Sequence, residues 1–199
     1  MYIRKGRSFR MPKWMHMRGM IMTELIIGKP DSGKSAFAEE KALEKKIMPG
    51  AGDLYYIATM QVIDEDSEKR VIKHREMREG KGFITIEKET DIAGVLDEID
   101  DPENAILLLE CISNLAGNEM HRIGVNGKDY DIDKIVSKVS DDIKRLSESV
   151  KSLIIVTNEF PLEEASESGY DEETKDYIKL VNDINEKLKS MAEVVYEFA

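Results

Sequence analysis

The sequence has little of what an exported, disulfide-linked or membrane-embedded protein needs. Its single cysteine, Cys111, cannot form an internal disulfide or a multi-cysteine metal site, so nothing requires an oxidising compartment. Its longest aliphatic run, residues 105–109, is far shorter than the ~20 residues that cross a bilayer. We therefore expect a cytoplasmic protein without a membrane span.

Acidic side chains are missing from the first 21 residues. That segment carries six basic groups, whereas the remainder holds 23 basic and 40 acidic side chains. An acidic body disfavours broad binding to DNA or RNA phosphates, so we expect no nucleic-acid partner and a local site for any nucleotide. The first residues also lack the apolar stretch of a secretory signal.

We interpret residues 1–21 as a basic leader that is disordered or artefactual, with a functional basic arm as the alternative. The remaining residues, 22–199, suit one folded domain, because 199 residues with 41% hydrophobic and 35% charged side chains can form a single core. No internal repeat or linker divides them.

Short apolar runs alternate with longer amphipathic stretches from residue 22 onward. This alternation is typical of βαβ units and predicts an α/β fold with a largely parallel central sheet flanked by helices. The predicted strands are residues 24–27, 54–59, 83–86, 105–110, 153–157 and 194–198. The predicted helices are residues 34–47, 65–78, 91–98, 132–150 and 172–191.

A phosphate-binding loop lies between the first predicted strand and the first predicted helix. The residues Gly28-Lys29-Pro30-Asp31-Ser32-Gly33-Lys34-Ser35 fit G-x-x-x-x-G-K-[ST] without mismatch. The glycines let backbone N–H groups surround phosphates, Lys34 would reach the β and γ oxygens, and the Ser35 hydroxyl would bind Mg²⁺. The motif predicts a nucleotide-binding fold of the P-loop NTPase type.

Two apolar strands end near a carboxylate that could serve Mg²⁺ or the nucleotide, Glu110 and Glu159. The sequence alone does not choose between them, because any buried strand must end in something polar. A regulatory GTPase is not indicated, since the guanine-reading N-K-x-D motif is missing. The spacing of Asp129, Asp131 and Asp133 fails the EF-hand pattern at its sixth and twelfth positions.

His74 lies in a predicted helix where Arg70, His74, Met77 and Arg78 share a face. Arginines beside a histidine suit a triphosphate, because they neutralise phosphate charge while a neutral imidazole nitrogen attacks phosphorus. The alternative is a solvated helix face with an incidental histidine. These residues alone leave both interpretations open.

Further segments follow the phosphate loop in a specific order. Residues 56–59 read Y-I-A-T, 70–74 read R-V-I-K-H, 83–87 read F-I-T-I-E, 108–112 read L-L-E-C-I and 156–159 read V-T-N-E. Together they resemble the bifunctional adenosylcobinamide kinase/adenosylcobinamide-phosphate guanylyltransferase family of cobalamin biosynthesis. The family's third segment has Trp where this chain has Phe83.

The resemblance implies an enzyme that phosphorylates adenosylcobinamide and then transfers GMP from GTP through a guanylyl-histidine. It implies His74 as that histidine, Lys34 as a catalytic partner, GTP, ATP and Mg²⁺ as nucleotides and metal, a corrinoid substrate and a homo-oligomer. By position it also implies nucleotide contacts at Thr59, Met60, Gln61, Arg78, Glu79, Gly80, Lys81, Glu87 and Glu110.

Two departures from the family pattern bear on corrinoid binding and on the kinase step. Residues 160–169 are acidic where the family usually has a glycine-containing loop, and the chain ends directly after its last predicted strand. The alternatives are a P-loop kinase or nucleotidyltransferase that performs one step or uses another substrate, and a catalytically silent GTP-binding homologue.

Overall fold

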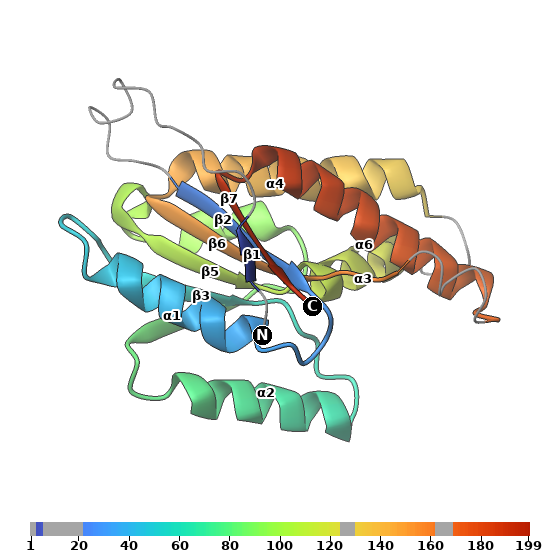
Figure 1. The fold of residues 1–199 in the computed structure, drawn as a ribbon, viewed down its shortest axis with the longest axis horizontal. Helices are drawn as coiled ribbons and strands as arrows, with labels where there is room; N and C mark the ends of the chain where they lie inside the picture. The colour runs from blue at the N-terminus through green and yellow to red at the C-terminus, as the bar shows by residue number, and fades with distance from the viewer. Residues whose placement is uncertain (1–2, 6–21, 124–129, 162–168) are drawn as a thin grey trace.

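The structure, a computed structural model, describes residues 3–5, 22–123, 130–161 and 169–199 (Figure 1). Its centre is a seven-stranded sheet in the order β1-β7-β2-β6-β5-β3-β4. Six strands are parallel, and β1 pairs antiparallel with β7 at one edge. The strands are β1 (Ile3–Lys5), β2 (Met22–Gly28), β3 (Leu54–Ala58), β4 (Phe83–Glu87), β5 (Ile106–Glu110), β6 (Ser152–Asn158) and β7 (Val194–Phe198).

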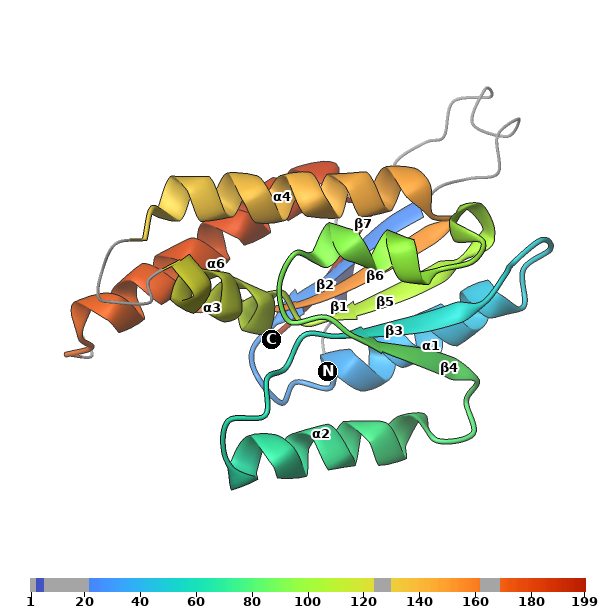
Figure 2. The same ribbon diagram turned by 180° about the vertical axis from the view of Figure 1, so that it is seen from behind.

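Helices cover both faces of this sheet. α1 (Lys34–Lys46) and α2 (Glu65–Arg78) lie on one side, and α3 (Ile112–Ile123), α4 (Ile132–Ser149) and α6 (Glu172–Met191) lie on the other (Figures 1 and 2). Two 3₁₀ helices, η2 (Ile92–Glu98) and η3 (Pro102–Asn104), join β4 to β5. None of the helices within the described ranges has the length and apolarity to cross a membrane.

Alternate residues of the central strands enter two hydrophobic clusters. In β5, Leu107 and Leu109 pack with α3, α4 and α6, whereas Ile106 and Leu108 pack toward α1. A parallel strand covered on both faces has no polar side, which explains the unbroken apolar runs in the sequence. The cluster toward α1 is smaller and uses Ala38 and Ala42, so α1 lies close to the sheet.

The α/β fold and the six parallel strands predicted from the sequence are confirmed, with strand ends that differ by one or two residues. The helix at α3 was missed, although its buried positions Ile112, Leu115, Ala116 and Met120 have helical spacing. Its serine, glycine and asparagines are poor helix formers and hid that spacing. The helix predicted at 91–98 is a 3₁₀ helix over Ile92–Glu98, in which the Gly94 N–H donates to the Asp91 carbonyl three residues earlier at 2.9 Å.

Part of the basic leader belongs to the sheet, since residues 3–5 form β1. The strand prediction left these residues out because residues 1–21 were interpreted as a disordered or artefactual leader. Three residues whose partner strand is distant in the sequence carry no pattern that could correct this interpretation. The rest of the leader lies outside the described residues, as do residues 124–129 and 162–168.

Gly28, the last residue of β2 and the first of the phosphate loop, lies against the last strand. It is the register partner of Phe198, and a Cβ on Gly28 would come within 2.1 Å of the Phe198 carbonyl oxygen. The neighbour is backbone and cannot rotate away. Only glycine fits where the loop leaves the sheet.

We expect Gly28→Ala to lower the free energy of unfolding by about 3 kcal/mol, because the added methyl group must push β7 away from β2. Gly82→Ala is the control: Gly82 has a φ of +80° but nothing within 4 Å of an added Cβ. It should cost only about 1 kcal/mol, from backbone strain. Urea unfolding of both variants measures this, and a Gly28→Ala loss no larger than that of Gly82→Ala would contradict the steric argument.

Candidate functional site

The carboxyl ends of four parallel strands meet at one edge of the sheet. The register places Val156 of β6, Glu110 of β5, Ala58 of β3 and Glu87 of β4 in one row across it. The phosphate loop follows β2 at the same edge. A cavity of about 630 Å³ opens there, lined by the loop, by the ends of these strands and by one face of α2. Crevices at this edge of open α/β sheets are the usual ligand sites.

The phosphate loop is folded around its own lysine. Lys34, the first residue of α1, is buried, and its ammonium donates to the carbonyl of Lys29 and, at 3.3 Å, to Ser32 Oγ. Burial lowers the pKa of Lys34, and the nearby carboxylates of Glu110 and Asp31 oppose that shift. Gly33 caps α1 with a φ of +89°, which turns the backbone so that N–H groups at the helix start face the cavity.

Ser35 and Glu110 contact each other across the cavity floor. The Ser35 hydroxyl donates to Glu110 Oε1, and the hydroxyl of Tyr56 donates to the other carboxylate oxygen at 3.2 Å. A hydroxyl and a carboxylate next to a phosphate loop are the oxygen ligands that Mg²⁺ takes, so these residues fit that ion. The alternative carboxylate, Glu159, is exposed and pairs with Lys189 on α6 at 3.3 Å. The geometry therefore favours Glu110.

Helix α2 supplies the wall opposite the loop. Its start is fixed by Asp64, whose carboxylate accepts from the Ser67 backbone N–H at 2.7 Å in a capping box. Arg70, His74 and Arg78 on one face of the helix line the cavity. Nδ1 of His74 is shielded from solvent and has no hydrogen-bond partner among the residues that the structure describes. A buried ring nitrogen without a partner is costly unless a ligand uses it.

Arg78 links α2 to the floor of the cavity. Its guanidinium carbon lies 3.4 Å from the ring centroid of Tyr56, and the side chain is buried. Within the described residues, its Nε and Nη1 have no partner. Burial and the Glu110 carboxylate raise the pKa of Tyr56, so its hydroxyl stays a donor. A connected series of contacts therefore runs from Arg78 through Tyr56 and Glu110 to Ser35.

The structure brings most of the sequence-predicted site residues to this cavity. Those that line it are Pro30, Asp31, Ser32, Gly33, Lys34, Ser35, Met60, His74, Arg78, Glu87 and Glu110. Glu87 forms an ion pair with Arg75 on α2. Gly28 and Lys29 lie at the loop's start, outside the lining.

The other predicted residues lie around the cavity rather than in it. Thr59 is fully buried, and its hydroxyl donates to the Cys111 carbonyl and accepts from the Cys111 N–H, at 2.9 and 2.8 Å. Lys81 forms an ion pair with the buried Glu39 at 2.6 Å. Glu79 and Gly80 line a smaller hollow at the end of α2, which shares Arg75, Arg78 and Thr85 with the cavity.

Sequence reasoning did not assign a role to Tyr56, Asn114 or Asn158, which also line the cavity. Tyr56 had a signal, because it opens the Y-I-A-T segment and enters the same cluster as Leu108 in the register-paired strand. No sequence signal pointed to Asn114, because it lies in helix α3, which was not predicted.

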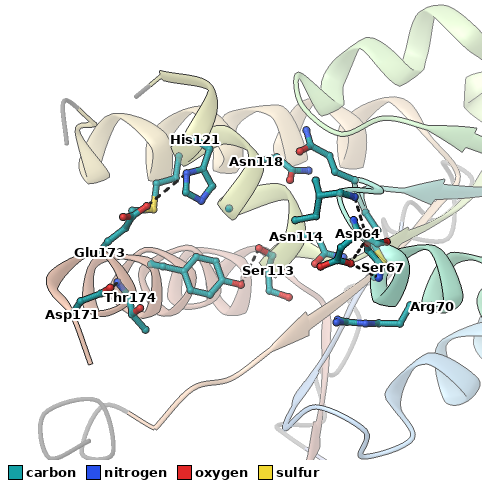
Figure 3. Close-up of a pocket in the computed structure, with 16 residues that line it drawn as sticks. Asp64, Ser67, Arg70, Ser113, Asn114, Asn118, His121, Asp171, Glu173 and Thr174 are labelled. Atoms are coloured by element: carbon teal, nitrogen blue, oxygen red, sulfur yellow. Dashed lines mark hydrogen bonds and ion pairs between the residues drawn. The ribbon is translucent and has the colours of Figure 1, made fainter. Parts of the chain in front are cut away.

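A second cavity of about 450 Å³ adjoins the first between α2, α3 and the start of α6 (Figure 3). It shares Met60, Arg70 and Asn114 with the first. Gln61, one of the predicted nucleotide contacts, lines this second cavity, and its amide donates to Glu89 at 3.0 Å.

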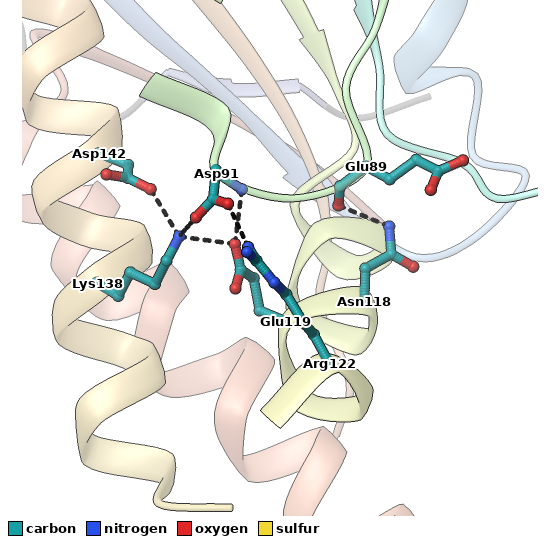
Figure 4. A network of polar contacts seen from close by, with 7 residues as sticks. All are labelled: Glu89, Asp91, Asn118, Glu119, Arg122, Lys138 and Asp142. Atoms are coloured by element: carbon teal, nitrogen blue, oxygen red, sulfur yellow. Dashed lines mark hydrogen bonds and ion pairs between the residues drawn. The ribbon is translucent and has the colours of Figure 1, made fainter. Parts of the chain in front are cut away.

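A polar network behind α3 holds the loops between the two cavities (Figure 4). The Asn118 amide donates to the carbonyls of Thr59 and Glu89, both at 2.8 Å, and so joins the segments that follow β3 and β4. The next residue, the buried Glu119, accepts from the Asp91 backbone N–H at 2.8 Å and pairs with Lys138 at 2.7 Å. These contacts keep the ends of β3 and β4 in place.

Comparison with known proteins agrees with the sequence motifs. The pattern of the family described as cobinamide kinase / cobinamide phosphate guanyltransferase matches residues 24–199. Two relatives are named bifunctional adenosylcobalamin biosynthesis protein CobU. The one from Escherichia coli (strain K12) is 24% identical over 181 residues, 88% of this chain and 94% of the relative. The one from Salmonella typhimurium (strain LT2) is 25% identical over the same shares.

Among solved structures, the flagellar accessory protein FlaH from Methanocaldococcus jannaschii resembles this chain with a TM-score of 0.43 and 14% identity. The likeness covers 89% of this chain and 70% of FlaH. It is too weak to carry an argument about function.

The two carboxylates that sequence alone could not separate give a direct test. We expect Glu110→Gln to weaken Mg²⁺-dependent nucleotide binding about 10-fold to 100-fold, because a charged hydrogen-bond acceptor in such a site is worth about 1.5–3 kcal/mol. Glu159→Gln is the matched control and should stay within about twofold of wild type. Titration calorimetry with and without Mg²⁺ distinguishes them, and an equal loss in both variants would refute the choice of Glu110.

The network behind α3 predicts a pH effect on stability. Hydrogen bonds from Arg122 and Lys138 hold the pKa of Asp91 below its ordinary 3.8. Its charge therefore stabilises the fold fully above that pH, and the contribution disappears as pH falls through the lowered pKa. Because Asp91 is half-exposed, Asp91→Asn should cost no more than about 1 kcal/mol near neutral pH.

Urea unfolding of this variant across the acid range checks the sign. The difference from wild type should shrink as pH falls below the ordinary pKa. Asp141→Asn, at an exposed position of α4, should show little difference at any pH. A Asp91→Asn deficit that grows toward acid pH would contradict the pairing.

Proposed function

The chain belongs to the cobinamide kinase / cobinamide phosphate guanyltransferase family, and we propose that it phosphorylates adenosylcobinamide and then transfers GMP from GTP to that phosphate through a guanylyl group on His74. One observation carries the proposal: His74 and the phosphate loop line the same cavity. The two matched relatives, named as bifunctional proteins of adenosylcobalamin biosynthesis, support the same pair of reactions.

The phosphate loop and the buried arginine would hold the nucleotide. Backbone N–H groups at the start of α1 and the Lys34 ammonium bind phosphate oxygens, after Lys34 releases the Lys29 carbonyl that it now contacts. Arg78 has two buried nitrogens without partners among the described residues, so a phosphate or the base edge of a nucleotide would satisfy them. Ser35 and Glu110 would hold Mg²⁺, which supplies charge neutralisation on the phosphates when bound.

GMP transfer then takes two displacements at the α phosphorus. In the first, a neutral imidazole nitrogen of His74 forms a P–N bond while the P–O bond to pyrophosphate breaks, and pyrophosphate leaves with the electron pair. Lys34 and Arg78 stabilise its charge. In the second, a phosphate oxygen of the acceptor attacks the same phosphorus, the P–N bond breaks and the imidazole is regenerated.

The kinase step uses the same loop. The hydroxyl oxygen of adenosylcobinamide attacks the γ phosphorus of ATP or GTP, the bond to the nucleoside diphosphate breaks, and the hydroxyl proton passes to solvent or to a nearby base. The residues contribute position and electrostatic stabilisation rather than a covalent step. Both reactions therefore require a nucleoside triphosphate in the cavity that the phosphate loop lines.

The test of the proposal is a covalent adduct. We expect protein incubated with Mg²⁺ and GTP labelled at the α phosphate to retain the label after denaturation, in an acid-labile form, since a P–N bond to histidine is hydrolysed by acid. Intact-mass analysis should show one added GMP, and His74→Ala should reduce labelling to background.

Replacement of the other described histidine is the control. His121 is exposed on α3, and His121→Ala should be labelled like wild type. If the wild-type protein binds GTP but forms no adduct, the guanylyl-histidine is wrong, and a kinase that performs one step or a silent GTP-binding protein becomes the better explanation.

A further inference from the structure

We propose that the second cavity, between α2, α3 and the start of α6, is the acceptor site, and that it holds the phosphate-bearing arm and one amide-bearing edge of the corrinoid (Figure 3). This inference rests on the proposed function, because it assigns the substrate that receives the phosphoryl and guanylyl groups. It adds a site that is separate from the nucleotide cavity.

The position of the cavity suits an acceptor. Arg70 and Asn114 line both cavities, so the two spaces meet at these side chains. Arg70 precedes His74 by one turn of α2, on the same face of the helix. An acceptor phosphate placed at Arg70 would therefore lie beside the imidazole that carries GMP, with the guanidinium as its counter-charge.

The chemistry of the lining suits amides. Neutral hydrogen-bonding side chains from three elements face the space: Gln61 after β3, Ser113, Asn114 and Asn118 on α3, and Tyr177 on α6. A corrinoid ring carries carboxamide side chains on its rim, and each needs both a donor and an acceptor. Asparagine and glutamine side chains offer both. The carboxylates of Asp64, Asp171 and Glu173 also line the cavity, so Arg70 is the lining residue that offers a positive charge to an acceptor phosphate.

Some of these groups are already committed and others remain free for a ligand. Tyr177 donates to the Ser113 carbonyl at 3.1 Å, and Asn118 donates to two loop carbonyls. Gln61 donates to Glu89 at 3.0 Å, and the Ser113 hydroxyl accepts from Asn158 at 2.8 Å, so these four residues define the wall. Within the described part of the chain, the side chains of Arg70 and Asn114 have no hydrogen-bond or ion-pair partner, although, beside hydrogen bonds from Ser67, the charge of Arg70 helps to lower the pKa of the nearby Asp64. The free groups therefore lie at the junction with the nucleotide cavity, where the reacting phosphate must be placed.

The size of the cavity limits what it can hold. A volume of about 450 Å³ is too small for a whole corrinoid with its upper ligand. It accommodates the aminopropanol phosphate arm and the adjoining rim, with the rest of the macrocycle outside. In this arrangement the protein selects the substrate mainly by its phosphate arm, because most of the corrin ring makes no contact with the cavity.

Gly117 offers a way to fill the cavity without harming the fold. It lies inside α3 and lines the space, and a Cβ there would lie 3.5 Å from the ring of Tyr177, which is ordinary contact. Because glycine is a poor helix former, Gly117→Ala and Gly117→Leu should both favour helix α3. The leucine projects further and takes up space that the acceptor needs.

The two half-reactions separate this inference from the proposed function. Adduct formation from labelled GTP needs only the nucleotide cavity, whereas release of the label to adenosylcobinamide phosphate needs the acceptor site. We expect Gly117→Leu to form the adduct within twofold of the wild-type rate and to lose at least tenfold in kcat/KM for transfer, mainly through a raised KM. Gly117→Ala, the matched control, should stay within threefold in both.

Normal adduct formation also shows that Gly117→Leu is folded. If Gly117→Leu fails to form the adduct, Thr174→Phe, which narrows the cavity from α6, replaces it in the same comparison. Transfer at the wild-type kcat/KM by a variant that fills the cavity would overturn the acceptor site. If wild-type protein forms no adduct, the proposed function fails, and the acceptor site fails with it.

Discussion

The parallel pairing of β2, β6, β5, β3 and β4 is the constraint on which the site depends. Parallel strands present their carboxyl ends at one edge, and the register aligns Val156, Glu110, Ala58 and Glu87 in a single row there. Because side chains alternate between the faces of a sheet, a slip of one residue in β5 would turn the Glu110 side chain toward the other face and away from Ser35. The slip would turn the Glu110 carboxylate toward the cluster that Leu107 and Leu109 enter, and burying that charge among apolar side chains would cost free energy.

The rigid sheet and the exposed helix α2 make different contributions to the candidate site. The strands place Glu110 and Tyr56 with little freedom, because almost every neighbouring side chain is buried. Only Ser67 and Arg78 are buried in α2, so the helix that carries His74 shares little surface with the core. The contact of Arg78 with Tyr56 joins the two parts, and it is of the cation–π type, worth about 2 kcal/mol when desolvated.

The fold was largely predictable because its signals are local. Unbroken apolar runs predicted the parallel strands, and the phosphate-loop motif predicted a strand before it and a helix after it. The order of the strands was not predictable, since it depends on pairing between distant segments. For the same reason the strand pattern left Glu110 and Glu159 as equal candidates, and only the family resemblance pointed to Glu110. Although β5 and β6 are neighbours, of these two carboxylates only Glu110 contacts Ser35. Because helix α3 was not predicted, the sequence analysis also missed Asn114, which lies on it, and the second cavity, which it lines.

The sparse burial of α2 has a consequence for how accuracy arises at the reacting atoms. An element held by few buried contacts opens and shifts at a small cost in free energy, so its amide protons should exchange earlier than those of β5. In the proposed reaction, a nucleotide would contact Arg78 and His74, whose buried nitrogens have no partner among the described residues, and would so add contacts that hold the helix. In the proposed mechanism, the sheet fixes Glu110 and Tyr56 before any nucleotide binds, whereas a bound nucleotide would itself fix the position of α2.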